Sequence, residues 1–219
     1  MRKTNKIGNI NPMIYEKTRD GEVYYDVFSR LVKNRIVFLA DSEGIDAETA
    51  TSLVATLLFL DGQSKTKEIS IYINSPGGTV SDGLFAIYDC IQFISAPIKT
   101  VVMGEACSAA GVLLVAGSQG KRFAMENASI MLHELQVSGM SGTGSEIQRE
   151  AERVRRMNDK IIQIIANHSG QTFEKVKNDL KNDKWFTAEE ALEYGLIDGI
   201  IKKTKTTPVK VSKVKQTKG

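Results

Sequence analysis

Apolar and polar positions alternate along most of the chain in a pattern that predicts short strands followed by helices. Runs rich in β-branched residues indicate buried strands, and apolar residues three or four positions apart indicate helices with one buried face. The expected strands are 35–39, 68–73, 98–103, 121–125, 129–132 and 197–201. The expected helices are 46–60, 81–93, 108–116, 146–167, 172–180 and 187–194. This alternation predicts an α/β fold with a largely parallel sheet and right-handed crossovers.

Both ends of the chain depart from this pattern. Residues 1–11 have the composition of a mobile leader, and residues 12–26 are polar and tyrosine-rich, with a turn at Asp20–Gly21. Residues 202–219 hold seven lysines and no acidic residue, which is typical of a flexible, solvated tail. We therefore expect a leader at 1–11, one domain at 12–201 and a lysine-rich tail at 202–219.

Composition and charge exclude several classes of protein. A hydrophobic content of 42% excludes a wholly disordered chain. The net charge of +3 comes from the tail, because its seven lysines leave −4 for the rest. The tail could touch nucleic acid, but no aromatic residue interleaves with its lysines, so we expect a solubilising role and no nucleic-acid partner.

The chain also lacks the features of an exported or membrane-bound protein. Its start has no apolar run of a secretory signal, and the low-charge stretch 101–117 is short and interrupted by Glu105. Two cysteines are too few for a disulfide scaffold, and together with two histidines they could form a zinc site only by using every one. These observations predict a soluble, cytoplasmic protein with no metal and no membrane partner.

Two turns built from small residues are the candidate sites of chemistry. The chain has no GxSxG motif, no P-loop, no dinucleotide fingerprint and no HExxH motif. Residues 75–78 (SPGG) end a strand, where glycines let backbone N–H groups approach an anion; an ordinary turn is the alternative. Residues 104–111 (GEACSAAG) put Ser108 at a helix start, as a nucleophile or merely as an N-cap.

A serine nucleophile needs a base and a group that orients the base. His168 ends a long helix, where a structural role suffices. His133 ends an apolar strand before a glycine-rich loop and is the remaining candidate base. Asp179 and Asp183 both precede Trp185, and spacing alone leaves both open as the acid.

Several of these segments, in the same order, resemble the ClpP family, the proteolytic subunits of Clp proteases. The matching segments are 72–78 (YINSPGG), 86–89 (AIYD) with 92–93 (QF), 104–108 (GEACS), 120–123 (GKRF), 130–133 (IMLH), 183–188 (DKWFTA) and 191–198 (ALEYGLID). The resemblance covers residues 12 to about 201, which leaves out only the leader and the tail. It implies a crotonase-like α/β fold of stacked ββα units with a protruding handle helix.

The resemblance also implies a role for individual residues. Ser108 matches the nucleophile of a serine endopeptidase, His133 its general base and Asp183 its acid. The backbone N–H groups of Gly78 and Ala109 match the oxyanion hole, which gives the two small-residue turns one purpose.

The resemblance further implies partners. Two heptameric rings of this chain would enclose a chamber, and the helix at 146–167 would join them. Unfolded substrates would come from a separate AAA+ unfoldase of the ClpX, ClpA or ClpC type that uses ATP, so no cofactor is expected in this chain. Tyr72, Phe93 and Ile201 match the pocket that receives the unfoldase, with ordinary core packing as the alternative.

Three departures from the family pattern bear on substrates and rings. Ala109 stands where methionine is usual, and Glu134–Leu135 stand where Gln-Pro is usual. One extra residue lies between Gly78 and Ala86.

Three other functions compete with an active peptidase: a weakly active structural ring subunit, an acyl-CoA enzyme of the same fold, and a nucleic-acid binder using the tail.

Overall fold

The computed structural model of the chain describes residues 12–19 and 21–202. The expected leader and the tail from residue 203 lie outside the described residues, so the division into leader, domain and tail stays a prediction. Lys202, the last described residue, lies 3.7 Å from Glu126 and 3.6 Å from Glu189. Within the described ranges, no helix is long and apolar enough to cross a membrane, and no group of acidic, histidine and cysteine side chains is arranged to hold a metal ion.

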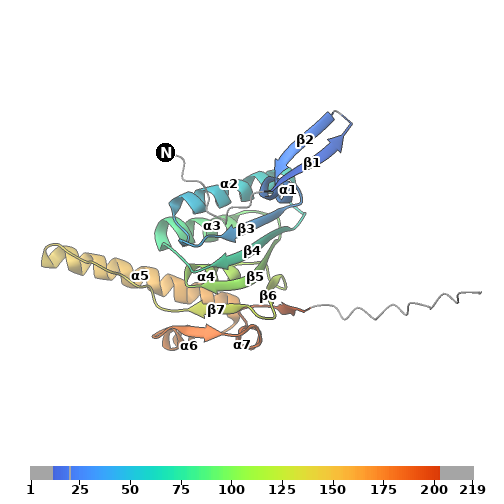
Figure 1. Ribbon diagram of the computed structural model, residues 1–219. Helices are drawn as coiled ribbons and strands as arrows, with labels where there is room; N and C mark the ends of the chain where they lie inside the picture. The colour runs from blue at the N-terminus through green and yellow to red at the C-terminus, as the bar shows by residue number, and fades with distance from the viewer. Residues whose placement is uncertain (1–11, 20, 203–219) are drawn as a thin grey trace, which may run out of the picture.

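A seven-stranded, mostly parallel sheet forms the centre of the molecule (Figure 1). Five strands run parallel in the order β3 (Ile36–Ala40), β4 (Ile69–Ser75), β5 (Ile98–Cys107), β6 (Arg122–Met125) and β9 (Gly199–Ile201). Strand β7 (Ser129–Leu132) pairs in parallel with β5, and β8 (Lys184–Phe186) pairs antiparallel with β7. The expected α/β class and the largely parallel sheet are confirmed.

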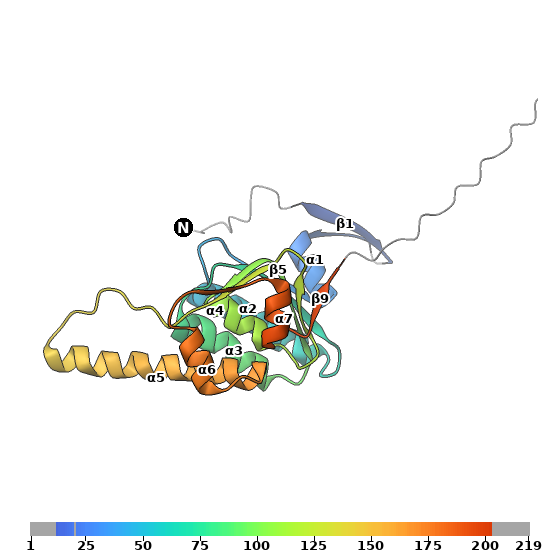
Figure 2. The same cartoon turned by 90° about the horizontal axis from the view of Figure 1, so that it is seen from below.

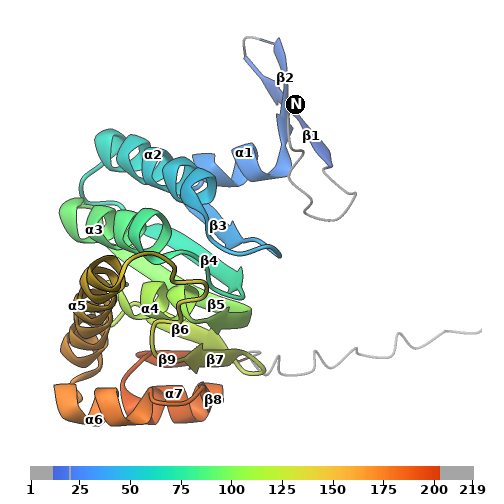
Figure 3. The ribbon, with the colours of Figure 1, turned by 90° about the vertical axis from the view of Figure 1, so that its left-hand side faces the viewer.

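Helices occupy the segments between the strands. They are α1 (Val27–Lys33), α2 (Ala47–Gln63), the π-helix η1 (Val80–Leu84), α3 (Phe85–Phe93), α4 (Ala109–Val115), α5 (Gly144–Ser169), α6 (Phe173–Asp179) and α7 (Ala188–Tyr194). Helices α2, α3 and α5 lie along one side of the sheet (Figure 3). The side chains of Asp46, Thr172 and Thr187 accept backbone N–H groups and so begin α2, α6 and α7.

The structure adds a hairpin that the hydrophobic pattern does not predict. Strands β1 (Met13–Thr18) and β2 (Gly21–Asp26) pair antiparallel and project from the body (Figure 1). The exposed rings of Tyr15 and Tyr24 contact each other across the hairpin at 5.5 Å between centroids. Cross-strand contacts of this kind stabilise a ribbon that has no buried face, which is why alternation of apolar and polar residues is absent there.

Helix α5 also projects from the body, with the glycine-rich segment that precedes it (Figures 1 and 2). A capping box between Thr143 and Glu146 begins the helix, and Gly170 ends it in the left-handed conformation. Its buried residues, Ile161, Ile162, Ile165 and Ala166, all belong to the C-terminal part. The N-terminal part of the helix is mostly exposed, as expected for a handle.

Strand β5 changes partner halfway along its length. Residues 100–102 pair with β6, and residues 105–107 pair with β7. Gly104 lies between them with φ 93°, and a Cβ there would lie 2.5 Å from Oδ1 of Asn74. The same Asn74 oxygen accepts the N–H of Glu105 at 3.1 Å. The change of partner carries the end of β5 away from β6 and against β7.

A buried ion pair joins β6 to the segment before β9. The Arg122 guanidinium donates to Asp198 at 2.6 and 2.9 Å, and also to the carbonyl oxygen of His168 at 2.7 Å. Burial raises the pKa of Asp198, but hydrogen bonds and charge from Arg122 outweigh it, so the pKa is lowered overall. This pair ties the end of α5 to the sheet.

Candidate active site

Ser108 occupies the sharp turn between β5 and α4. Its backbone has φ 51° and ψ −121°, and its N–H donates to the carbonyl oxygen of Met131 at 2.8 Å. Its side chain makes no capping hydrogen bond, so the alternative of a side-chain N-cap is wrong. A non-glycine residue held at positive φ costs about 1–3 kcal/mol, and such strain is concentrated at functional sites. The strand-to-turn-to-helix path is also the one that exposes a nucleophilic serine in α/β hydrolases.

The structure brings His133 to Ser108. Because Cys107 pairs with Met131 in the β5–β7 ladder, the residues that follow both strands lie side by side. Nε2 of His133 lies 2.8 Å from Oγ of Ser108, a hydrogen-bond distance. The imidazole side chain is 14% exposed. Of the two histidines, His133 thus meets the requirement for a base.

His168 has a structural environment instead. Its Nε2 lies 3.2 Å from the hydroxyl of Tyr88, and the two rings meet edge to face. Burial, with the nearby charge of Arg122, lowers the pKa of His168. A neutral imidazole packed in this way holds α5 against α3. Its contacts are with Tyr88, not with Ser108.

Asp183 reaches His133 through β8, a strand that the sequence analysis did not predict. In the antiparallel ladder Leu132 pairs with Lys184, so the next pair outward is His133 with Asp183. Oδ1 of Asp183 lies 3.7 Å from Nδ1 of His133, beyond hydrogen-bond distance. Nδ1 is buried and has no hydrogen-bond partner in the described part of the chain, while the Asp183 side chain is 56% exposed.

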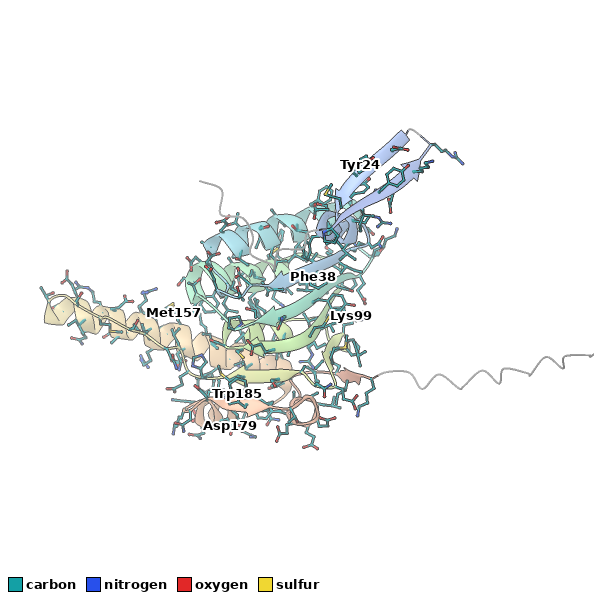
Figure 4. The ribbon with its side chains drawn as sticks, in the orientation of Figure 1. Tyr24, Phe38, Lys99, Met157, Asp179 and Trp185 are labelled. Atoms are coloured by element: carbon teal, nitrogen blue, oxygen red, sulfur yellow. The ribbon has the colours of Figure 1, made fainter. Side chains whose placement is uncertain are left out.

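Asp179, the other candidate acid, is engaged elsewhere. Its carboxylate accepts from Lys175 at 2.7 Å and from the Tyr194 hydroxyl at 2.8 Å, and pairs with Lys184 at 2.9 Å. Burial raises the pKa of Asp179, but the hydrogen bonds and charges of these three partners outweigh that effect. The pKa of Asp179 is therefore lowered overall, to about 2. The carboxylate therefore fastens α6 to β8 and α7. Figure 4 shows Asp179 and Trp185 together at this end of the molecule.

The two small-residue turns meet at Ser108. A Cβ on Gly77 would lie 2.7 Å from Cβ of Ser108 and 3.4 Å from the nitrogen of Ala109. Gly78 is held against Ile45, whose N–H donates to Gly77 O at 2.6 Å and whose carbonyl accepts from Thr79 at 2.8 Å. These two hydrogen bonds do not use the Gly78 N–H as a donor. The Ala109 N–H belongs to the first turn of α4, where a backbone N–H has no intrahelical acceptor. Gly78 and Ala109 both line one pocket together with Ser108.

A pocket of about 190 Å³ opens beside these groups. Its lining residues are Gly78, Val80, Leu84, Ser108, Ala109, Val112, His133, Glu134, Leu135, Gln136 and Ile161. The sequence analysis did not place Val80, Leu84, Gln136 or Ile161 here, because they come from η1, the segment after β7, and α5.

Next to Ser108, burial raises the pKa of Cys107 to about 11, so this thiol stays protonated and does not compete as a nucleophile.

The π-helix η1 lies in the segment where the sequence analysis expects one extra residue relative to the family pattern. A π-helical turn takes up one residue more than an α-helical turn, and such turns are frequent at functional sites. Val80–Leu84 lie between Gly78 and Ala86, so a π-helical turn would accommodate the expected extra residue. Val80 and Leu84 both line the pocket, so η1 forms part of the wall of the site.

The three residues expected to dock an unfoldase do not form one cluster in this chain. Tyr72 is half-buried on β4 and stacks on Phe38 at 5.5 Å between ring centroids. Phe93, at the end of α3, is 80% exposed, which contradicts core packing for this residue. Ile201 is half-buried on β9, three strands away from β4.

A serine hydroxyl in hydrogen-bond contact with an imidazole, at a strand-to-helix turn of an α/β fold, is the arrangement of a serine hydrolase. Comparison with known families agrees with this class and narrows it. The family model described as Clp protease matches residues 19–204, and the chain therefore belongs to the Clp protease family of serine peptidases. One relative, an ATP-dependent Clp protease proteolytic subunit from Ligilactobacillus salivarius (strain UCC118), is 45% identical over 197 residues, or 90% of this chain and 98% of the relative.

Family membership confirms the resemblance noted in the sequence and the expected enzyme class. Clp proteases are cofactor-independent serine peptidases, so the chemistry of this chain uses amino-acid side chains and backbone groups alone. The alternative of an acyl-CoA enzyme is set aside by the same finding. A nucleic-acid role for the tail lies outside the described residues.

Proposed function

We propose that this chain is the peptidase subunit of an ATP-dependent protease, with Ser108 as nucleophile, His133 as general base and Asp183 as the acid that orients the imidazole. The observation that carries the proposal is the 2.8 Å contact between Ser108 Oγ and His133 Nε2. The strained backbone of Ser108 supports it, because a side-chain cap would not need that conformation.

The reaction follows from this geometry. Ser108 Oγ attacks the carbonyl carbon of the scissile peptide while His133 Nε2 takes the hydroxyl proton. The C–N bond then breaks, and His133 returns the proton to the leaving amine. Water, deprotonated by the same Nε2, attacks the acyl-enzyme and releases the acid and the free Ser108 hydroxyl. Asp183 stabilises the imidazolium and holds the tautomer that exposes Nε2 to Ser108.

The backbone N–H groups of Gly78 and Ala109 donate to the carbonyl oxygen as it becomes negative. Such donors are rigid and largely shielded from water, and one of them typically contributes about 3 kcal/mol to transition-state stabilisation. The dipole of α4, whose first turn includes Ala109, adds to the same field. The contact of Gly77 with Ser108 supports this role, since it keeps the two turns in register.

The proposal extends to partners. Two stacked heptameric rings of this chain would enclose the sites, with the projecting α5 as the joint between rings. A separate AAA+ unfoldase, which hydrolyses ATP, would feed unfolded proteins into the chamber. We assign its docking to Tyr72, Phe93 and Ile201, supplied by neighbouring subunits because one chain does not unite them. The bacterial origin of the relative and its name support a cytoplasmic location and an ATP-dependent partner.

Intact-mass detection of a fluorophosphonate adduct tests the active site directly. The expected result is one adduct on the wild-type chain and none on Ser108→Ala. Cys107→Ser is the matched control, because it alters the neighbouring side chain and keeps the triad. An unlabelled wild-type chain in assembled rings would refute an active peptidase.

The gap at Asp183 favours one alternative, a structural ring subunit with weak activity. An imidazole whose Nδ1 has no acceptor is a poorer base, and here the nearest carboxylate oxygen is 3.7 Å away. Labelling rates separate the two functions. An active subunit labels at the same rate alone or with an unfoldase partner present, whereas a structural subunit labels slowly in both cases.

A further inference from the structure

The pocket beside Ser108 holds a charged residue that the reaction above does not use. Most of its wall is apolar, from Val80, Leu84, Ala109, Val112, Leu135 and Ile161. Of the described residues that line it, Glu134 is the single carboxylate, and none is lysine or arginine. His133 acts as a base only when neutral, so it does not compensate the negative charge of Glu134 in the working enzyme.

The backbone on both sides of Glu134 is held in place. The Glu134 N–H donates to the carbonyl oxygen of Leu180 at 2.9 Å, and the Leu135 N–H donates to Oδ1 of Asn158 at 2.9 Å. The residue is half-buried at the pocket. Its position beside Ser108 is therefore a built feature of the site rather than that of a free surface loop.

The Glu134 carboxylate also differs from its acidic neighbour Asp179, which has three partners. Across residues 12–19 and 21–202, the Glu134 side chain makes no ion pair and no side-chain hydrogen bond. A carboxylate with no protein cation, on the wall of a largely apolar pocket, is free to form a charge-assisted hydrogen bond with a cationic group of the substrate.

The shape of the pocket indicates which cation fits. Lysine and arginine have aliphatic stems that pack on apolar walls while the charged end reaches a polar group. The small side chain of Ala109 and the η1 wall leave room for such a stem next to the nucleophile. Arginine also binds a carboxylate through two N–H groups, a geometry that a neutral side chain cannot reproduce.

We infer that Glu134 makes this pocket select a basic side chain, lysine or arginine, next to the scissile bond of the substrate. The inference rests on the proposed function and deepens it. Two of the positions where the sequence analysis notes a departure from the family pattern, Ala109 and Glu134, line this pocket together with Val80 and Leu84 of η1. Together these residues would change which substrate side chain the pocket prefers next to the scissile bond.

The test uses two fluorogenic peptides that differ only in arginine or citrulline before the scissile bond. Citrulline keeps the size and hydrogen-bonding shape of arginine but carries no charge. We expect kcat/KM for arginine to exceed that for citrulline by about tenfold in the wild type, and the ratio to fall near one in Glu134→Gln. Glu193→Gln, an exposed change on α7, is the matched control and keeps the wild-type ratio.

Salt gives a second measurement that needs no variant. An ion pair at a half-exposed carboxylate weakens as ionic strength rises, so the wild-type arginine-to-citrulline ratio should fall between low and high salt. A ratio near one at low salt, in enzyme that takes the fluorophosphonate and cleaves both peptides, would overturn the inference and leave the peptidase standing. No adduct and no cleavage of either peptide would overturn both.

Discussion

Gly77 offers the sharpest test of how the two turns cooperate, because it touches Ser108 without belonging to the triad. In Gly77→Ala the new Cβ would lie 2.7 Å from Cβ of Ser108 and 2.9 Å from the carbonyl oxygen of Cys107. Carbon atoms in contact lie about 3.5–4.0 Å apart, so the turn must retreat by about 1 Å. The turn is tied on its other side by Ile45 N–H and by Ser75 Oγ, and these two hydrogen bonds oppose such a retreat.

A shift of this size moves the Gly78 N–H out of line with the developing oxyanion. Losing one such donor lowers kcat by about 100- to 1,000-fold. We expect a fall of that order in peptide hydrolysis, and an equally slower rate of fluorophosphonate labelling, since both need the same two donors.

The control must separate displacement from backbone strain. Gly120 has φ 79°, and a Cβ there meets nothing within 4 Å. Gly120→Ala therefore carries the cost of a left-handed alanine, about 1–2 kcal/mol of stability, without moving the site. Urea unfolding of both variants measures that shared cost. If Gly77→Ala labels and cleaves within threefold of wild type, the oxyanion-hole argument fails.

Three further predictions concern carboxylates. Asp183→Asn keeps the shape but removes the charge that stabilises imidazolium, so kcat should fall at least about 100-fold in peptide hydrolysis; an unchanged rate would mean that His133 works alone. Asp198→Asn leaves the buried Arg122 without its counter-charge and should cost about 3–5 kcal/mol in urea unfolding, and a loss below 1 kcal/mol would contradict the assigned pair. The pKa of Asp179 is lowered from 3.8 to about 2, so its partners stabilise the folded state by roughly 2 kcal/mol above pH 4, and this contribution is lost as the pH falls toward 2. Asp179→Asn should therefore be weaker than wild type in urea unfolding at pH 7 and close to it near pH 2, and an equal deficit at both would show that charge is not the cause.

The sequence predicted most of the alternating strands and helices because each of these segments carries its own hydrophobic pattern and capping residues. Helix α2 begins at Asp46 and α7 at Thr187, where the cap and the apolar spacing coincide. Strand β8 was missed because three residues cannot express a period of two, and its pairing with β7 comes from a distant segment. The hairpin at the start was missed because neither of its faces is buried.

The candidate site shows the same division between local and long-range information. Spacing could nominate Ser108 but could not tell a nucleophile from an N-cap, since the difference lies in a backbone angle and in a side chain arriving from β7. Spacing also left Asp179 and Asp183 equal. Resemblance chose Asp183, and the register of β7 with β8 supplies the physical reason.

The late position of β8 along the chain has a consequence for synthesis in the cell. The turns of Gly78 and Ser108 belong to units that are complete early, whereas Asp183 follows Ser108 by about 75 residues. At about 5–20 residues per second, the ribosome adds this carboxylate some 4–15 s after the serine. During that interval a growing chain holds its nucleophile without the acid that orients the base. A subunit still on the ribosome therefore carries an incomplete proposed triad until Asp183 and β8 have been made.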